Sequence, residues 1–161
     1  MTDEDFMKLA VEEANNAQEN GELPIGAVIV KNGRVISKGR SSTWPKKDPS
    51  AHGETESIRN ACKVLGSLDL SGCTMYGTLE PCTACLGTAA WASLPRAVFG
   101  CFSSDVPDNP YEYENYSAIE HSKHLRLYLG GKIEVIGGIL RDECTELMRP
   151  VKDWQMQDYL L

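Results

Sequence analysis

Apolar and polar residues along the first part of the chain predict helices separated by short strands. Apolar side chains recur at helical spacing up to Gly21, which predicts a first helix that ends there. The nearly continuous apolar run over residues 25–30 is typical of a buried strand. Asn32-Gly33 is a strong hairpin signal, so residues 35–39 are expected to form the antiparallel partner of that strand.

The alternation of helices and strands continues to the end of the chain. Residues 41–50 contain two prolines and are expected to form a loop. Three further strands are predicted over residues 73–79, 97–100 and 132–139. Further helices are predicted over about 51–65, 82–93 and 142–148, and one more contains His121, His124 and Leu127. Strands separated by helices indicate an α/β fold, with a mixed and partly parallel sheet of about five strands in a three-layer α/β/α domain.

Length and composition favour one globular domain. The chain has 161 residues, of which 42% are hydrophobic and 24% are charged. A chain of this size can bury a sizeable core, and the sequence contains no internal repeat and no low-complexity segment. We therefore interpret residues 1–161 as a single domain.

Charge and targeting signals narrow the choice of partner and compartment. The net charge is −7 and Lys and Arg are not clustered, so a nucleic-acid partner is expected to be unlikely. The acidic start lacks the features of a signal peptide, and no apolar run is long enough to span a membrane. We therefore expect a cytoplasmic protein with reduced thiols. Four of its six cysteines are expected to be small buried apolar residues: Cys62, Cys73, Cys101 and Cys144.

The remaining two cysteines belong to a pattern that predicts a zinc site. Cys82 and Cys85 are one helical turn apart, so both sulfurs can face one ion. His52 can supply a third ligand, which leaves one position of a tetrahedral site open. A helix start at Pro81 favours the thiolate form of the cysteines, because free N–H groups and the helix dipole lie there.

This arrangement predicts hydrolytic deamination. A zinc ion with three protein ligands supplies a nucleophile derived from water at neutral pH. Glu54, two residues from His52, is placed to carry protons to a ring nitrogen and then to the leaving amine. The backbone N–H near Cys82 is a candidate donor to the tetrahedral intermediate, in the manner of an oxyanion hole.

Two simpler interpretations of the cysteine pair are less consistent with the sequence. A structural zinc site normally has four protein ligands, and neither a second C-x-x-C nor an H-x3-H pattern occurs. A redox pair would leave His52 and Glu54 unexplained. For His121 and His124, an exposed helix face is the expected explanation.

Several motifs resemble the cytidine/deoxycytidylate deaminase superfamily. They are His52-Gly53-Glu54, the run Thr78–Cys85, the run Arg96–Gly100 and the run Pro24–Val30. The H-x-E…P-C-x-x-C pattern is the signature of zinc deaminases. The resemblance covers roughly 6–101 and is nearest to the branch that holds cytosine deaminase, guanine deaminase and tRNA adenosine deaminase.

The resemblance implies a fold, a ligand set and an assembly. It implies a cytidine-deaminase-like three-layer domain, in which His52, Cys82 and Cys85 bind zinc and Glu54 is the proton shuttle. It also implies a homodimer that packs near the helices of the metal site.

Candidate substrate contacts also follow from the resemblance. His-Gly-Glu, with Gly53 in place of alanine, is similar to the cytosine deaminase form, and Trp154 is then a candidate wall of the base pocket. Asp158 is a candidate for the aspartate that contacts the base. Ser41 stands where relatives carry an asparagine that binds the base, and a serine cannot present both a donor and an acceptor in one plane. The acidic segment 105–114 either supplies a carboxylate that accepts from the N–H groups of a guanine-like edge or is a variable surface loop.

Three functions are consistent with these residues. The leading hypothesis is zinc-dependent deamination of a free nucleobase or a related small heterocycle. The alternative is a tRNA adenosine deaminase, which converts adenosine to inosine in a flipped nucleotide. A non-catalytic zinc-binding domain is a further alternative.

Overall fold

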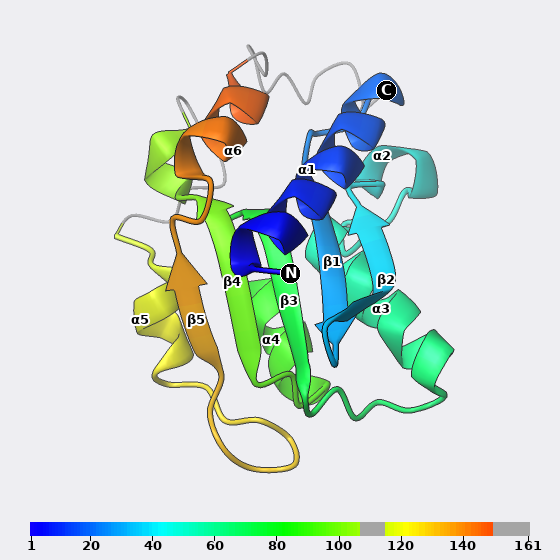
Figure 1. The fold of residues 1–161 in the computed structure, drawn as a ribbon, viewed down its shortest axis with the longest axis vertical. Coiled ribbons are helices and arrows are strands. Elements are labelled where there is room, and N and C mark those ends of the chain that lie inside the picture. Colours follow the sequence, from blue (N-terminus) through cyan, green and yellow to red (C-terminus); the bar gives the residue numbers. More distant parts are fainter. Residues whose placement is uncertain (107–114, 150–161) are drawn as a thin grey trace.

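A five-stranded mixed sheet forms the centre of the protein (Figure 1). The computed structural model describes residues 1–106 and 115–149. The strand order is β2-β1-β3-β4-β5, in which β1 is antiparallel to β2 and β3, and β3, β4 and β5 run parallel to one another. The strands are β1 Gly26–Lys31, β2 Arg34–Arg40, β3 Cys73–Leu79, β4 Arg96–Cys101 and β5 Glu134–Gly137.

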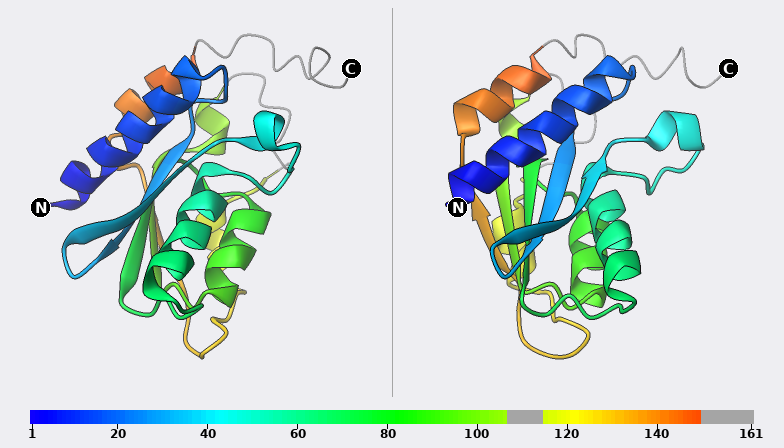
Figure 2. Two further views of the ribbon diagram at one scale, coloured as in Figure 1. Left: turned by 90° about the vertical axis from the view of Figure 1, so that its right-hand side faces the viewer. Right: turned by 45° about the vertical axis from the view of Figure 1, so that its right-hand side comes forward.

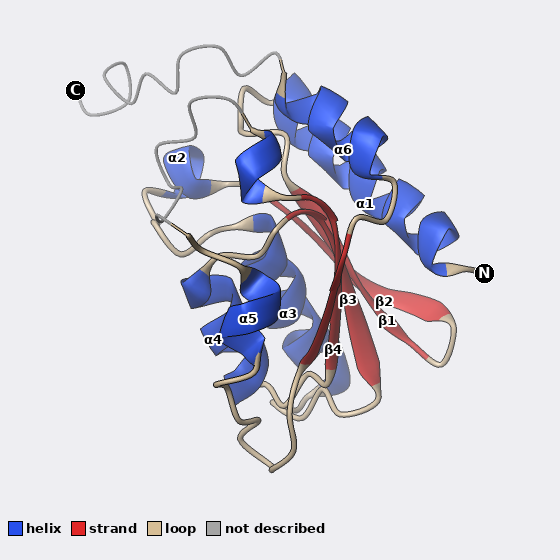
Figure 3. Ribbon diagram, turned by 90° about the vertical axis from the view of Figure 1, so that its left-hand side faces the viewer, coloured by secondary structure: helices blue, strands red, loops and turns tan. Residues whose placement is uncertain are grey.

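Helices cover both faces of this sheet (Figure 3). Helices α1 (Asp3–Glu19) and α6 (Arg141–Met148) lie on one face. Helices α3 (Gly53–Leu65), α4 (Thr83–Trp91) and α5 (Ala118–Ser122) lie on the other. Each face has its own cluster of buried apolar side chains. The predicted three-layer α/β/α architecture is confirmed.

Local sequence explains where the first elements begin and end. The Thr2 hydroxyl accepts from the backbone N–H of Asp5, and the Asp5 carboxylate accepts from the N–H of Thr2, so a reciprocal cap starts α1. Asn32 and Gly33 both have positive φ, 51° and 72°, as a two-residue type I′ hairpin turn requires. The predicted hairpin between β1 and β2 is confirmed.

Two glycines bring helices close to the sheet and thereby position the site. A Cβ on Gly26 would lie 2.3 Å from the carbonyl oxygen of Ala10, so α1 can pack directly on β1 only because this side chain is absent. A Cβ on Gly39 would lie 2.3 Å from the carbonyl oxygen of Gly53. The start of α3 therefore packs against β2 at backbone distance.

Four elements differ from the sequence prediction. The loop over 41–50 contains a short helix, α2 (Thr43–Lys46), in which Pro45 occupies the first turn, where its missing N–H costs nothing. Figure 2 shows α2 at the end of a loop that stands away from the sheet. Helix α5 ends at Ser122, so His124 and Leu127 lie beyond it, and β5 is shorter than the apolar run that predicted it. A 3-10 turn, η1 (Ser103–Asp105), follows β4.

The cysteines outside the predicted metal site are free thiols. Cys73, Cys101 and Cys144 are buried and Cys62 is partly exposed. A Cβ on Gly100 would lie 2.2 Å from the sulfur of Cys144, so α6 packs tightly on β4 at this point. In the described ranges, none of the helices is both long and apolar enough to cross a bilayer.

Candidate active site

The predicted metal ligands meet where two helices begin. His52 is the N-cap residue of α3, and Cys82 is the N-cap residue of α4, with Cys85 in the first turn of that helix. Neither N-cap side chain makes a capping hydrogen bond, and both contribute to the cluster of ligand atoms instead. Helix starts place unsatisfied N–H groups and positive dipole ends beside these side chains.

The spacing of the ligand atoms fits a zinc ion. The two sulfurs are 3.5 Å apart, and His52 Nδ1 lies 3.6 Å from Cys82 Sγ and 3.5 Å from Cys85 Sγ. A tetrahedral zinc ion with bonds of about 2.3 Å to sulfur and about 2.1 Å to nitrogen separates such atoms by roughly 3.6–3.8 Å. Two thiol sulfurs and one imidazole are also the donor types that zinc prefers.

Neighbouring groups set the charge of these ligands. A hydrogen bond from Cys85, aided by His52, lowers the pKa of Cys82 to about 4 despite its burial. The same bond and burial raise the pKa of Cys85 well above its ordinary value, so Cys82 is the first thiolate of the pair. The Cys82 thiolate in turn raises the pKa of His52 to about 9.

Glu54 lies beside the three ligands and is buried, with 3% of its surface exposed. Burial, and then the charge of Cys82, raise the pKa of Glu54 to about 7. A Cβ on Gly77 would lie 3.5 Å from Glu54 Cγ, so the side chain packs over β3. A carboxyl group with a pKa near neutrality can both accept and donate a proton under ordinary conditions.

Ser41 is held by a glutamate that sequence reasoning missed. Its hydroxyl donates to Glu22 across 3.3 Å, and only 3% of the residue is exposed. The Ser41 N–H donates to the carbonyl of Ile25, and a Cβ on Gly53 would lie 3.0 Å from that same oxygen. Ser41 and Gly53 therefore both pack against the backbone carbonyl of Ile25, next to the start of α3.

A second missed group is the buried Glu80, which precedes the cysteine motif. Its two carboxylate oxygens accept from the backbone N–H groups of Ser103, at 2.9 Å, and of Ala118, at 2.7 Å. The Tyr116 hydroxyl donates to the carbonyl of Pro81 across 2.6 Å. These bonds tie Ser103, Tyr116 and Ala118 to the stretch before Cys82. These hydrogen bonds join segments that are far apart in sequence, so no local sequence pattern predicts the partners of Glu80.

The remaining predicted substrate contacts are placed only in part. Trp154 and Asp158 lie outside the described residues, as do residues 107–114 of the acidic segment. Asp105, which is described, forms a bidentate ion pair with Arg141 at 2.5 and 2.9 Å. Its carboxylate is therefore already bound to a cation.

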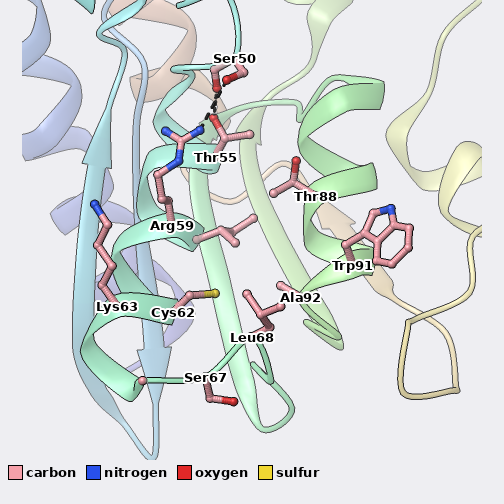
Figure 4. A pocket seen from close by; sticks show the side chains of 12 residues that line it. Ser50, Thr55, Arg59, Cys62, Lys63, Ser67, Leu68, Thr88, Trp91 and Ala92 are labelled. Atoms are coloured by element: carbon pink, nitrogen blue, oxygen red, sulfur yellow. Dashed lines mark hydrogen bonds between the residues drawn. The ribbon is translucent and has the colours of Figure 1, made fainter.

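A groove of about 660 Å³ lies between α3 and α4, outside the metal cluster (Figure 4). Neither the three ligands nor Glu54 line it. Arg59 and Cys62 of α3 face Thr88 and Trp91 of α4 across it, and 71% of Trp91 is exposed. The homodimer that the resemblance implies stays a prediction.

Comparison with known proteins identifies the same region of the chain. A family model described as the cytidine and deoxycytidylate deaminase zinc-binding region matches residues 1–101, which include all four cluster residues. The chain is 36% identical over 146 residues to a tRNA-specific adenosine deaminase of Bacillus subtilis (strain 168), covering 91% of this chain and 86% of the relative. It is 47% identical over 102 residues to a guanine deaminase of the same bacterium, covering 62% of this chain and 64% of the relative.

Solved structures agree with this assignment of the fold. A structure from a study of A-to-I editing by tRNA:A34 deaminases at the wobble position of transfer RNA matches with a TM-score of 0.74 and 34% identity. That match covers 88% of this chain and 97% of the other. A guanine deaminase from Bacillus subtilis matches with a TM-score of 0.62 and 34% identity, over 77% of this chain and 91% of the other.

These relatives correct two predictions made from sequence. The prediction that the substrate is a free nucleobase is wrong, because the sequence relatives that are 32–36% identical over 89–91% of this chain are tRNA-specific adenosine deaminases. The prediction that a nucleic-acid partner is unlikely is contradicted by the same finding. Net charge is a property of the whole surface, whereas phosphate contacts depend on local groups. The predicted zinc cofactor agrees with the family model and with the ligand geometry.

Proposed function

This chain belongs to the cytidine and deoxycytidylate deaminase family, and we propose that it deaminates adenosine to inosine in tRNA. The observation that carries the proposal is the 36% identity to a tRNA-specific adenosine deaminase over 91% of this chain. That alignment extends well beyond the metal motif, into the part of the sequence where substrate choice is expected to lie. We place the whole activity in one domain spanning 1–161.

The zinc ion would be held by His52, Cys82 and Cys85, whose spacing supports this assignment. When bound, it supplies a water-derived nucleophile at neutral pH. Burial keeps bulk water away from Cys85 and strengthens electrostatic interactions within the cluster.

Glu54 is the proposed proton shuttle of the reaction. In hydrolytic deamination a C6–O bond forms and the C6–N bond breaks, so water and adenosine give inosine and ammonia. The Glu54 carboxylate takes a proton from water and delivers it to N1 of the ring. It then takes the second proton from the hydroxyl group added at C6 and transfers it to the leaving amine, which departs as ammonia. Its pKa of about 7 supports this role, because neither protonation state is costly at neutral pH.

The backbone N–H of Cys82 is the proposed hydrogen-bond donor to the developing oxyanion. In the described ranges this N–H has no backbone or side-chain acceptor. Cys82 also supplies a ligand sulfur. One turn of backbone therefore positions both the hydrogen-bond donor and the metal ligand.

The loop that carries α2 is the proposed first contact with the tRNA backbone. It leads into His52, and its helix α2, which ends at Lys46 and is capped by Lys47, stands away from the sheet (Figure 2). Lys46 forms an ion pair with Glu56, so Lys47 is the better candidate for a phosphate contact. A local cationic loop is compatible with a net charge of −7.

A substrate panel tests the proposal. Purified zinc-loaded protein is incubated with total tRNA, adenosine, adenine, guanine and cytosine, and inosine and ammonia are measured by mass spectrometry and an enzymatic assay. We expect inosine in tRNA and little ammonia from the free compounds. Ammonia from a free base without inosine in tRNA would contradict the proposal, and the Glu54→Gln variant measures the background.

A further inference from the structure

We propose that Tyr116 is a positioning residue of this active site, which fixes the peptide between Pro81 and Cys82 so that the Cys82 N–H is aimed at the reacting ring. The inference rests on the proposed function, because it assigns a role in the same reaction. Tyr116 itself is not proposed to contact the substrate.

The hydrogen bond from Tyr116 acts on the peptide that contains the proposed donor. Its hydroxyl donates to the Pro81 carbonyl across 2.6 Å, a short distance for an O–H···O bond. The Pro81 carbonyl and the Cys82 N–H belong to one planar trans peptide, so they point in opposite directions. Fixing the carbonyl from one side therefore fixes the direction of the N–H on the other.

The same bond strengthens the N–H as a donor. Hydrogen bonds in a chain polarise one another, so a peptide whose carbonyl accepts a bond donates more strongly from its nitrogen. In residues 1–106 and 115–149, the Cys82 N–H has no acceptor, and its strengthened donor capacity is thus available to a substrate.

Tyr116 is mounted rigidly enough to serve this purpose. Ala118, two residues later, donates its N–H to Glu80 at 2.7 Å, and Glu80 immediately precedes Pro81. Ser117 caps α5 by accepting from the N–H of Glu120. Two hydrogen bonds therefore join the two segments: one runs from Tyr116 to Pro81, and the other runs from Ala118 to Glu80.

The phenol remains a donor over the whole working range of pH. Burial, and then the negative charge of Cys82 and Glu80, raise the pKa of Tyr116 well above its ordinary value. A phenolate has no proton to donate and would repel the carbonyl oxygen of Pro81. The partly buried phenol therefore stays protonated at neutral pH and can donate to the Pro81 carbonyl.

The Tyr116→Phe variant of the full zinc-loaded chain removes only the hydroxyl. We expect kcat for tRNA deamination to fall about tenfold, the effect of losing one well-placed hydrogen bond, with KM and zinc content unchanged. Tyr128→Phe is the matched control, since Tyr128 is 66% exposed, and this variant should retain wild-type kcat. A Tyr116→Phe variant with unchanged kcat, or one whose KM rises while kcat is retained, would overturn the proposal.

A spectroscopic readout tests the bond without any substrate. In Tyr116→Phe, the ¹³C′ resonance of Pro81 and the ¹⁵N resonance of Cys82 should both shift, because they report the lost bond and the altered polarisation. Unchanged resonances would overturn the inference whatever the substrate is. Wild-type protein that makes no inosine in tRNA overturns the proposed function instead, and the resonances still decide whether Tyr116 polarises this peptide.

Discussion

Two buried glutamates beside the thiolate ligands have opposite environments. Glu54, at the start of α3, is 3% exposed and lies among sulfur atoms, and burial raises its pKa to about 7. Glu80, between β3 and α4, is 5% exposed, and two backbone N–H groups bond to its carboxylate oxygens. Burial alone therefore does not distinguish the two.

The difference lies in the partners of each carboxylate. Two backbone N–H donors hold the carboxylate of Glu80 in place, which suits a structural role. Burial and a neighbouring thiolate raise the pKa of the Glu54 carboxyl to about 7. Both of its protonation states are then accessible at neutral pH, which suits proton transfer. The comparison assigns chemistry to Glu54 and architecture to Glu80, and substitutions at the two positions should separate activity from stability.

The largest effect is expected for Glu54→Gln. Glutamine keeps the volume but cannot carry a proton, so kcat should fall about 10²–10⁴-fold. Zinc content should stay at the wild-type level, because Glu54 is not a proposed ligand. Steady-state kinetics with tRNA and a metal assay check both expectations, and retained kcat would remove Glu54 from the mechanism.

Glu80→Gln should give the reverse pattern. An amide has one oxygen, so one of the N–H groups of Ser103 and Ala118 would face an NH2 group and lose its acceptor. The free energy of unfolding should fall by about 1–3 kcal/mol. Denaturant unfolding measures this loss. Glu134→Gln is the control, because the Glu134 side chain is mostly exposed and pairs with Arg96 at 3.4 Å, and an equal loss there would contradict the assignment.

Gly53→Ala changes the neighbour of Glu54 without altering the carboxylate. The added Cβ would lie 3.0 Å from the carbonyl of Ile25, so the start of α3 or the backbone of Ile25 must shift by a few tenths of an ångström. We expect a loss of about 1 kcal/mol in stability. Gly87→Ala in α4 meets no atom within 4 Å and should be neutral or stabilising, as alanine is the better helix former.

The smallest effect concerns another buried glutamate, Glu22, and it depends on pH. Burial raises the pKa of Glu22 above its ordinary value of 4.5, so the folded state holds this proton more tightly than the unfolded state does. Its contribution to stability is fully present below pH 4.5 and is lost as the pH rises through the raised value. Melting temperatures of Glu22→Gln should show a flatter pH dependence over this range than wild type. An unchanged slope would contradict the burial argument.

Local sequence signals account for the features that were predicted well. The hairpin at Asn32-Gly33, the strands of the sheet and the ligand cluster depend on residue types at short or characteristic spacings. The partners of Glu22, Glu80 and Tyr116 depend on contacts across 19 to 38 residues, which no local pattern encodes.

Substrate choice could not be predicted for a related reason. The cluster of His52, Glu54, Cys82 and Cys85 specifies a reaction that free bases and tRNA nucleosides share. The features used to choose between them were global, namely net charge and the scarcity of Lys and Arg, and they indicated the wrong partner. The sequence singles out Ser41 as a departure from related proteins, whereas the bond of Ser41 to Glu22 appears only in three dimensions.

The most direct test of the account is a map of inosine along tRNA exposed to the purified protein. Inosine is read as guanosine during reverse transcription, so sequencing of treated and untreated tRNA locates each edited adenosine. The account predicts A-to-G changes at defined positions with the wild-type protein and none with Glu54→Gln. Treated tRNA that is identical to untreated tRNA, from protein with a full complement of zinc, would contradict it.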